Sequence, residues 1–224
     1  MDKYVGCKLE RNKEQQWIRF TQPVLLQSYT DEFSIPADVE PTIPAEDGQI
    51  LVLCKRVNGV KESVQGMYRS GVGKLLHMMQ WSRPEILNSV RELSRHMPVA
   101  EPRHMKALFR VLRYCSLTPE QGLLLKPTRT WTGNPDHEFI IQGFSDANYA
   151  TDPSNRRSIS GYCVLLEGAP VSMKSGQQAS VTLSTTEAEL VSATQCAQDM
   201  LFIMRVLELI GLKVRKSMIL KIDN

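Results

Sequence analysis

Residues 137–152 read HEFIIQGFSDANYATD, and this stretch decides how the second half of the chain folds. Apolar residues from Phe139 to Ile141 lead through an alternating segment to Asp146, and small polar residues follow. Such a run is typical of a buried strand that carries a carboxylate near its end. Because a carboxylate in an apolar strand is costly unless a cation or hydrogen bonds hold it, we expect Asp146 to have partners elsewhere in the chain.

Two further acidic positions bear on Asp146. Glu189 stands at the head of a helical pattern that runs from about Ser184 to Ile210, and Asp223 ends the apolar strand Met218–Asp223. A helix between a hairpin and a further strand makes that strand parallel to its sheet neighbour, most simply the first strand. Two parallel strands would then both end in an aspartate. We therefore expect an α/β (α+β) mixed sheet whose edge gathers three carboxylates.

The segments between these acids support the same fold. Ile159–Leu166 and Val171–Ser175 are expected strands, and the short turn between them predicts an antiparallel hairpin. The following helix is expected to end at Gly211, a residue suited to a left-handed cap. Its residues predicted to face the sheet are Leu190, Ala193, Ala197, Leu201 and Met204.

Three acids that converge from two strand ends and one helix can bind hard divalent cations through oxygen. Two Mg²⁺ ions about 3.5–4 Å apart can activate a water and stabilise the leaving oxygen when a phosphodiester is hydrolysed. Histidine or cysteine ligands would indicate zinc, and the sequence places none beside these acids. Each acid alone also has an ordinary role, as a turn cap, a strand end or a first-turn helix residue.

The helix offers two candidate ligands, Glu187 and Glu189. Ser184 with Glu187 fits a capping box, and Thr186 with Glu189 fits one as well, so capping does not separate them. Glu189 directly precedes Leu190 and the predicted inward face. We therefore favour Glu189 as the metal ligand and keep Glu187 as the alternative.

The first half of the chain has a different pattern. Tyr4–Gln22 is an expected hairpin, Pro23–Phe33 a short helix, and Ser34–Val64 a proline-containing connector. Three expected helices follow in a compact bundle, one over Met67–Gln80, one opening at Ser82-Arg83-Pro84-Glu85 and one over Pro102–Ser116. The third carries one basic face, formed by Arg103, Lys106, Arg110 and Arg113. The predicted division of the chain is 1–64, 65–135 and 136–224.

Composition limits the class of protein. Hydrophobic residues make up 42% and charged residues 23%, which is ordinary for a globular protein. The net charge of +3 is compatible with nucleic-acid binding but does not by itself indicate it. The five cysteines are scattered, which argues against a disulfide framework or a zinc site and for a reducing compartment. No apolar run approaches the ~20 residues that span a bilayer, so we expect an intracellular protein without a membrane partner.

The motifs of the second half closely resemble those of the ribonuclease H domain of copia-type retrotransposon polyproteins. They match in order and spacing as GFSDANYA (143–150), DP (152–153), RRSISGYCV (156–164), KS (174–175), STTEAE (184–189) and IDN (222–224). The first half resembles the segment after the polymerase palm in the same polyproteins, through YRS (68–70), GKLL (73–76), RPEI (83–86), LSR (93–95), KAL (106–108) and RVLRY (110–114). Tyr4–Gln22 is similar to the last hairpin of that palm.

The resemblance implies a ribonuclease H fold that cleaves the RNA strand of an RNA–DNA hybrid with Mg²⁺. It implies Asp146, Glu189 and Asp223 as metal ligands. Such enzymes grip the backbone of the hybrid and sense 2′-hydroxyls. The residues that would contact phosphate are Arg156, Arg157 and Lys174. The implied partners are the hybrid and the reverse transcriptase and integrase parts of the polyprotein, and the implied location is a cytoplasmic virus-like particle and the nucleus.

The sequence also departs from the family pattern. The paired-aspartate polymerase motif is absent, and the chain stops at Asn224, before the family's final strand, helix and fourth acidic ligand, which weakens the second metal site. Met173 stands where the family usually has tryptophan. The expectation is a truncated ribonuclease H domain behind a helical connection segment. Two alternatives stay open: a catalytically dead remnant that only binds nucleic acid or the polymerase part, and an integrase-like strand transferase of the same fold.

Overall fold

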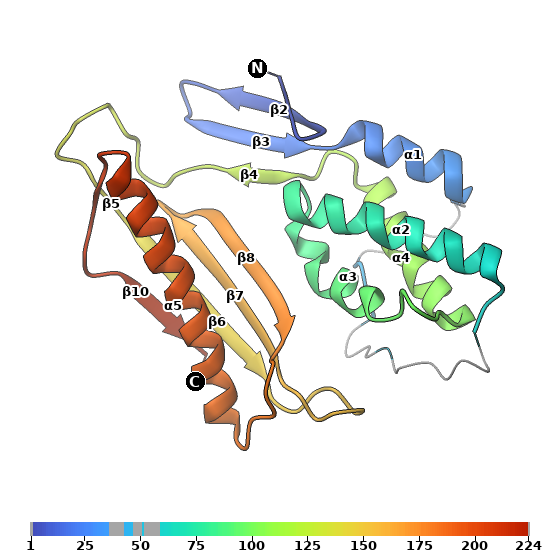
Figure 1. Ribbon diagram of the computed structural model, residues 1–224. Coiled ribbons are helices and arrows are strands. Elements are labelled where there is room, and N and C mark those ends of the chain that lie inside the picture. Colours follow the sequence, from blue (N-terminus) through green and yellow to red (C-terminus); the bar gives the residue numbers. More distant parts are fainter. Residues whose placement is uncertain (1, 36–42, 47–50, 52–58, 224) are drawn as a thin grey trace. The chain divides into compact units, whose positions relative to one another are not determined.

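The computed structural model describes residues 2–35, 43–46, 51 and 59–223 (Figure 1). The chain forms two compact units, one made of Met1–Glu10 and Arg19–Leu123, the other of Arg11–Ile18 and Leu124–Asn224. The three-part division predicted from the sequence is finer than this and stays a prediction. Most of the predicted connector from Ser34 to Val64 lies outside the described residues, and its last residues belong to a helix.

The first half of the chain is mainly helical. Its elements are β1 (Lys3–Tyr4), β2 (Cys7–Asn12), β3 (Trp17–Thr21), α1 (Pro23–Phe33), α2 (Glu62–Trp81), the 3₁₀ helix η2 (Pro84–Ile86), α3 (Leu87–Ser94), α4 (Pro102–Leu117) and β4 (Leu123–Leu125). The four strands form one sheet in sequence order. The helices bury a common apolar core that includes Tyr29, Tyr68, Leu75, Met78, Leu93, Leu108 and Leu112. The predicted helices are therefore present, although the one opening at Ser82 begins as a 3₁₀ turn.

This bundle also buries two stacked imidazoles. The rings of His96 and His104 lie 3.8 Å apart between centroids, and both side chains are almost fully buried. The Nε2 atom of His96 lies 3.2 Å from the carbonyl oxygen of Leu51. Burial lowers the pKa of His96, Arg95 and Arg103 lower it further, and the carbonyl of Leu51 and the carboxylate of Glu101 oppose the shift only in part.

A buried histidine with a lowered pKa makes the bundle acid-sensitive. Below about pH 6.5 the unfolded chain takes up a proton that the folded chain still excludes, so the free energy of unfolding should fall with pH from that point. We expect the urea midpoint of the wild type to drop between about pH 6.5 and 5. His96→Gln, which keeps a group able to reach the Leu51 carbonyl, should lose part of this slope. An unchanged slope in His96→Gln would contradict the assignment.

The second half of the chain is built on a mixed sheet. Its elements are β5 (Glu138–Phe139), β6 (Ile141–Asn148), β7 (Ile159–Leu166), β8 (Ala169–Gln177), α5 (Thr185–Leu209), β9 (Lys213–Val214) and β10 (Ile219–Ile222). The main sheet has the order β10-β6-β7-β8, and β5 pairs separately with β9. Strands β6, β7 and β8 are antiparallel neighbours, whereas β10 runs parallel to β6. The predicted parallel pairing of the last strand with the first is confirmed, and the chain is an α+β protein with mixed sheets.

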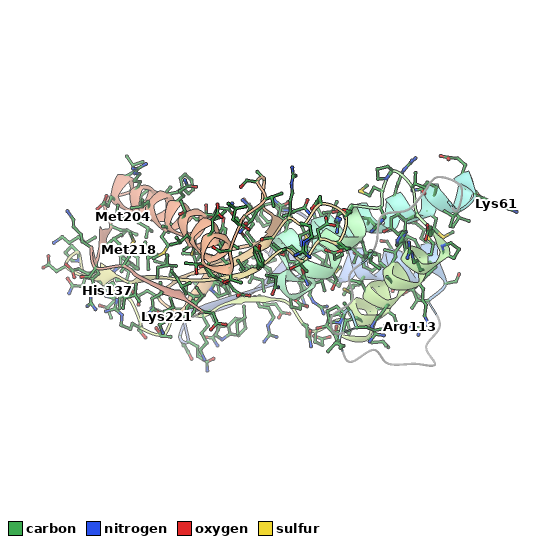
Figure 2. The ribbon with its side chains drawn as sticks, turned by 90° about the horizontal axis from the view of Figure 1, so that it is seen from below. Lys61, Arg113, His137, Met204, Met218 and Lys221 are labelled. Carbon is green, nitrogen blue, oxygen red and sulfur yellow. The ribbon has the colours of Figure 1, made fainter. Side chains whose placement is uncertain are left out.

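Helix α5 lies across one face of this sheet (Figure 1). Gly143 on β6 permits the close approach, because a Cβ there would lie 2.5 Å from Sδ of Met200 and 2.7 Å from Sγ of Cys196. Near the end of the helix, Met204 and Met218 lie together over the same core (Figure 2). The buried members of the core are Ile141, Tyr162, Val164, Cys196, Met200, Leu207 and Val214.

The prediction that Leu190 and Leu201 face the sheet is wrong, since these side chains are 59% and 40% exposed. The buried residues of α5 are Ala188, Ser192, Ala193, Cys196, Met200 and Leu207. The sequence misleads here because apolar residues surround much of the helix, so hydrophobicity does not define one face. The close approach to the sheet favours small side chains in the buried stripe. None of the described helices is long and apolar enough to cross a membrane.

Candidate metal and nucleic-acid site

Asp146 lies near the end of β6, opposite Gly161 of β7. Alternate residues of a strand point to opposite faces of the sheet. The buried residues of β6, such as Gly143 and Ser145, face α5, whereas Phe144 and Asp146 are exposed on the other face. The expectation of a buried charge at Asp146 is therefore wrong. The apolar run before it predicts a strand correctly, but α5 covers only one face of that strand.

Asp223 directly follows β10 and continues the parallel register. Ile222 pairs with Ser145, and the backbone N–H of Asp223 donates to the carbonyl of Ser145 over 3.4 Å. Asp146 and Asp223 line the same open pocket of about 480 Å³. The two aspartates predicted to meet at the ends of parallel strands thus share one depression.

Glu189 reaches the same end of the sheet from the second turn of α5. Its Oε1 accepts a hydrogen bond from the backbone N–H of Ala147, the residue after Asp146, over 3.0 Å. Its Oε2 is buried and accepts no hydrogen bond from any residue that the structure describes. A buried carboxylate oxygen without a donor is costly, and a cation would remove that cost.

Glu187 has a different environment. It is exposed, and its Oε2 accepts a hydrogen bond from the backbone N–H of Leu183 over 2.6 Å. The N–H of Glu187 in turn donates to Oγ of Ser184, the residue that caps the helix, over 3.1 Å. Glu187 therefore satisfies backbone groups at the start of α5, whereas Glu189 contacts the strand that carries Asp146.

The structure does not gather the three carboxylates, because Glu189 comes from α5, which covers the face opposite to Asp146, and Glu189 does not line the pocket that Asp146 and Asp223 share. Among the described residues, no three histidine, cysteine, aspartate or glutamate side chains are gathered closely enough to hold a metal ion. The structure brings Asp146 and Asp223 into one pocket and Glu189 onto the neighbouring backbone. Like-charged carboxylates repel one another, so a bound cation would favour their closer approach. The donors are all carboxylate oxygens, which suit Mg²⁺.

Cys163 also lines the pocket but does not alter this donor set. Burial raises the pKa of its thiol, so the sulfur is protonated at neutral pH. A protonated thiol is a poor metal ligand, because the thiolate is the form that binds metals. The chemistry of the pocket is therefore that of oxygen ligands. The four cysteines that the structure describes are all free.

The three predicted phosphate contacts do not lie together. Arg156 and Arg157 belong to the loop between β6 and β7, at the end of the sheet where Asp146 lies. Lys174 pairs with Tyr162 across β7 and β8, and its Nζ lies 5.9 Å from the centre of the Tyr162 ring. The Tyr162 hydroxyl donates to a carboxylate of α5, so Lys174 lies on the helix-covered face, opposite to Asp146.

Two residues that the sequence analysis passed over also bear on the site. Oγ of Ser192 on α5 lies 2.9 Å from the carbonyl oxygen of Asp146 and 3.2 Å from that of Gly161, which fixes both strands at this position. Lys221 lines the pocket, and its Nζ lies 5.2 Å from the centre of the Phe144 ring, on the side of the sheet away from α5 (Figure 2). Lys221 stands two residues before Asp223, and that spacing could have placed both on one face.

No family model matches the chain, and no solved structure matches it. The chain is similar to the Retrovirus-related Pol polyprotein from transposon RE1 of Arabidopsis thaliana, with 32% identity over 75% of this chain and 11% of the relative. It is also similar to the Retrovirus-related Pol polyprotein from transposon TNT 1-94 of Nicotiana tabacum, with 28% identity over 96% of this chain and 16% of the relative. The chain thus spans between 11% and 16% of the length of these two polyproteins.

A shorter relative is the Secreted RxLR effector protein 161 of Plasmopara viticola, with 38% identity over 59% of this chain and 87% of the relative. The transposon polyproteins match a larger part of the chain, including nearly all of it in the tobacco protein. The similarity to the tobacco polyprotein therefore extends over both units of the chain.

Proposed function

Because the chain belongs to the Pol polyproteins of copia-type retrotransposons, we propose that residues 136–224 form a ribonuclease H domain acting on RNA–DNA hybrids. The observation that carries the proposal is that Asp146 and Asp223 line one pocket, while Glu189 accepts a hydrogen bond from the backbone N–H of Ala147, next to Asp146. The strand order β10-β6-β7-β8, with α5 joining β8 to the parallel edge, supports the fold implied by the motifs.

Asp146, Glu189 and Asp223 would hold Mg²⁺, which when bound supplies an activated water and stabilises the charge that develops at the phosphate. The residues of this chain contribute placement. Ser192 fixes the backbone that carries Asp146, and the N–H of Ala147 holds one oxygen of Glu189. The free oxygen of Glu189 remains for the ion, which supports Glu189 over Glu187 as the ligand. Three carboxylates supply fewer ligands than a two-metal site uses, so the second position is the weaker one.

The proposed substrate is the hybrid formed during reverse transcription. Recognition would depend on the backbone and on the 2′-hydroxyls of the RNA strand, so sequence preference should be weak. The arginines of the β6–β7 loop, of which Arg156 is exposed and Arg157 half-buried, are suited to phosphate contacts. The reverse transcriptase and integrase parts of the polyprotein are the proposed protein partners.

Substrate choice tests this proposal. We expect the chain to cut the labelled RNA strand of an RNA–DNA hybrid in Mg²⁺, to stop when a chelator is added, and to spare a DNA–DNA duplex of the same sequence. Denaturing gels of matched substrates would measure this. Cleavage of the DNA duplex would instead indicate an integrase-like activity. Tight binding of the hybrid without any cleavage would indicate the non-catalytic remnant.

A further inference from the structure

We propose that Asp152 is a positioning residue, whose buried carboxylate holds the β6–β7 loop so that Arg156 and Arg157 are presented together to the phosphates of the hybrid. The inference rests on the proposed function and extends it to the way in which substrate is gripped. It concerns the loop from Tyr149 to Ser158, which joins the strand of Asp146 to its antiparallel neighbour.

Asp152 is only 1% exposed, although neighbouring residues of its loop lie at the surface. Its Oδ1 accepts hydrogen bonds from the backbone N–H of Ser154 over 2.9 Å and from Oγ of Ser154 over 2.6 Å. Its Oδ2 accepts from Nε2 of Gln177 over 2.6 Å. Since Gln177 ends β8, the carboxylate ties a loop between β6 and β7 to the edge strand of the sheet.

The backbone of Asp152 closes the same loop. The N–H of Arg156 donates to the carbonyl of Asp152 over 2.8 Å, and the N–H of Asp152 donates to the carbonyl of Arg157 over 3.2 Å. Arg156 has a φ of +58°, a left-handed conformation that is unfavourable for a residue with a side chain and persists only where surrounding contacts impose it. The bonds around Asp152 supply those contacts and thereby set the direction of the Arg156 side chain.

The exposed part of the loop is cationic. Asp152 is the only acid in Thr151–Arg157, and its charge is buried and hydrogen-bonded. Arg156 is exposed and Arg157 half-buried, and within the described part of the chain neither guanidinium has a carboxylate partner. Two unpaired guanidiniums held at adjacent positions suit the oxygens of a phosphate backbone.

A loop that only joined β6 to β7 would not need a buried, hydrogen-bonded carboxylate. Two antiparallel strands can be joined by a two-residue turn, whereas burial of a carboxylate is costly unless its hydrogen bonds are complete. The loop emerges where Asn148 pairs with Ile159, two residues beyond Asp146 on the same strand. The arginines are therefore presented at the end of the sheet that carries Asp146, whereas Lys174 lies on the helix-covered face of the sheet.

The role of the loop can be measured as the affinity of the full chain for the RNA–DNA hybrid. A chelator is added so that cleavage is blocked during the measurement. The double variant Arg156→Ala/Arg157→Ala should weaken binding roughly tenfold and lower the slope of log affinity against log salt by about 1.8. Asp152→Ala should weaken binding by roughly three- to tenfold and lower the same slope, since the arginines lose their fixed positions. Arg205→Ala, which removes an exposed charge on α5, is the matched control and should retain most of the affinity.

A double-mutant cycle separates positioning from general scaffolding. If Asp152 acts through the arginines, adding Asp152→Ala to the Arg156→Ala/Arg157→Ala variant should change affinity by less than about twofold. Asp152→Asn should bind the hybrid more tightly than Asp152→Ala does. The Oδ1 of the asparagine can still accept from Ser154, and its amide nitrogen faces the Gln177 side chain, whose own amide group can flip. Circular dichroism and thermal unfolding of each variant would check that it is folded.

If Asp152→Ala does not fold, Ser154→Ala and Gln177→Leu provide the test, since each removes one hydrogen bond to the carboxylate of Asp152 and keeps the carboxylate itself. Each should weaken binding less than Asp152→Ala and only when the arginines are present. Equal losses with and without the arginines, or an Asp152→Ala protein with wild-type affinity and salt slope, would overturn the inference. If the wild type cuts the hybrid but Asp152→Ala binds it as the wild type does, only the inference about the loop is wrong. If the wild type neither binds nor cuts the hybrid, both the inference and the proposed function are wrong.

Discussion

Asp146→Asn is expected to reduce Mg²⁺-dependent cleavage of the hybrid by roughly a thousandfold or more, to the level without added metal. The substitution removes one negative charge from the proposed ion site. Because Asp146 is exposed, it should leave the fold intact. Single-turnover rates on a labelled hybrid, with thermal unfolding as the control for folding, would measure the effect. A folded Asp146→Asn protein with unchanged cleavage would contradict the proposed role of Asp146.

The two glutamates of α5 give a matched comparison. Glu189→Gln should lose cleavage as Asp146→Asn does, since its unpartnered oxygen is the one left for the ion. Glu187→Gln should keep the cleavage rate and lose about 0.5–1 kcal/mol of stability, because Glu187 serves the start of the helix. The reverse result, with activity lost only in Glu187→Gln, would assign the ligand to Glu187.

Gly143→Val is expected to destabilise the second unit by about 2–3 kcal/mol. A Cβ at this position would already lie 2.5 Å from Sδ of Met200 and 2.9 Å from Cδ1 of Leu220, so the branched side chain would push α5 away from β6. Since α5 carries Glu189, cleavage should fall together with stability. Urea unfolding followed by circular dichroism would measure the change.

Gly161→Val is the matched control for Gly143→Val. Gly161 lies on the neighbouring strand, and a Cβ there would meet other atoms only at 4.0 Å. The free energy of unfolding of Gly161→Val should therefore remain within about 0.5 kcal/mol of the wild-type value. Only stability is compared in this pair, because Gly161 lines the pocket. Equal destabilisation by the two substitutions would show that close packing of α5 at Gly143 is not the cause.

The topology of the second unit could be predicted from the sequence because its signals are local and follow one another. The apolar run before Asp146, the short turn at Glu167 and Gly168, and the last apolar strand each define one element. A helix that connects a hairpin to a further strand makes that strand parallel to its sheet neighbour, and this rule gives the parallel pairing of β10 with β6. These features require no knowledge of which side chains meet.

The details of the site could not be predicted in the same way. The exposure of Asp146 depends on which face of the sheet α5 covers, and that face is set by Gly143 and the small residues of the helix. The hydrogen bond from Ala147 to Glu189 depends on the height of α5 above the strand. The buried role of Asp152 depends on Gln177, which lies on a different hairpin arm. Such contacts arise from packing between distant segments.

The position of a bound divalent cation is the decisive measurement for the proposed site. Crystals of the chain grown with Mn²⁺ in place of Mg²⁺ would give an anomalous signal at each bound ion. We expect a peak at the end of the sheet within coordination distance of carboxylate oxygens from Asp146, Glu189 and Asp223. A peak held by other residues, or an empty site at Mn²⁺ concentrations that support cleavage, would contradict the proposed site.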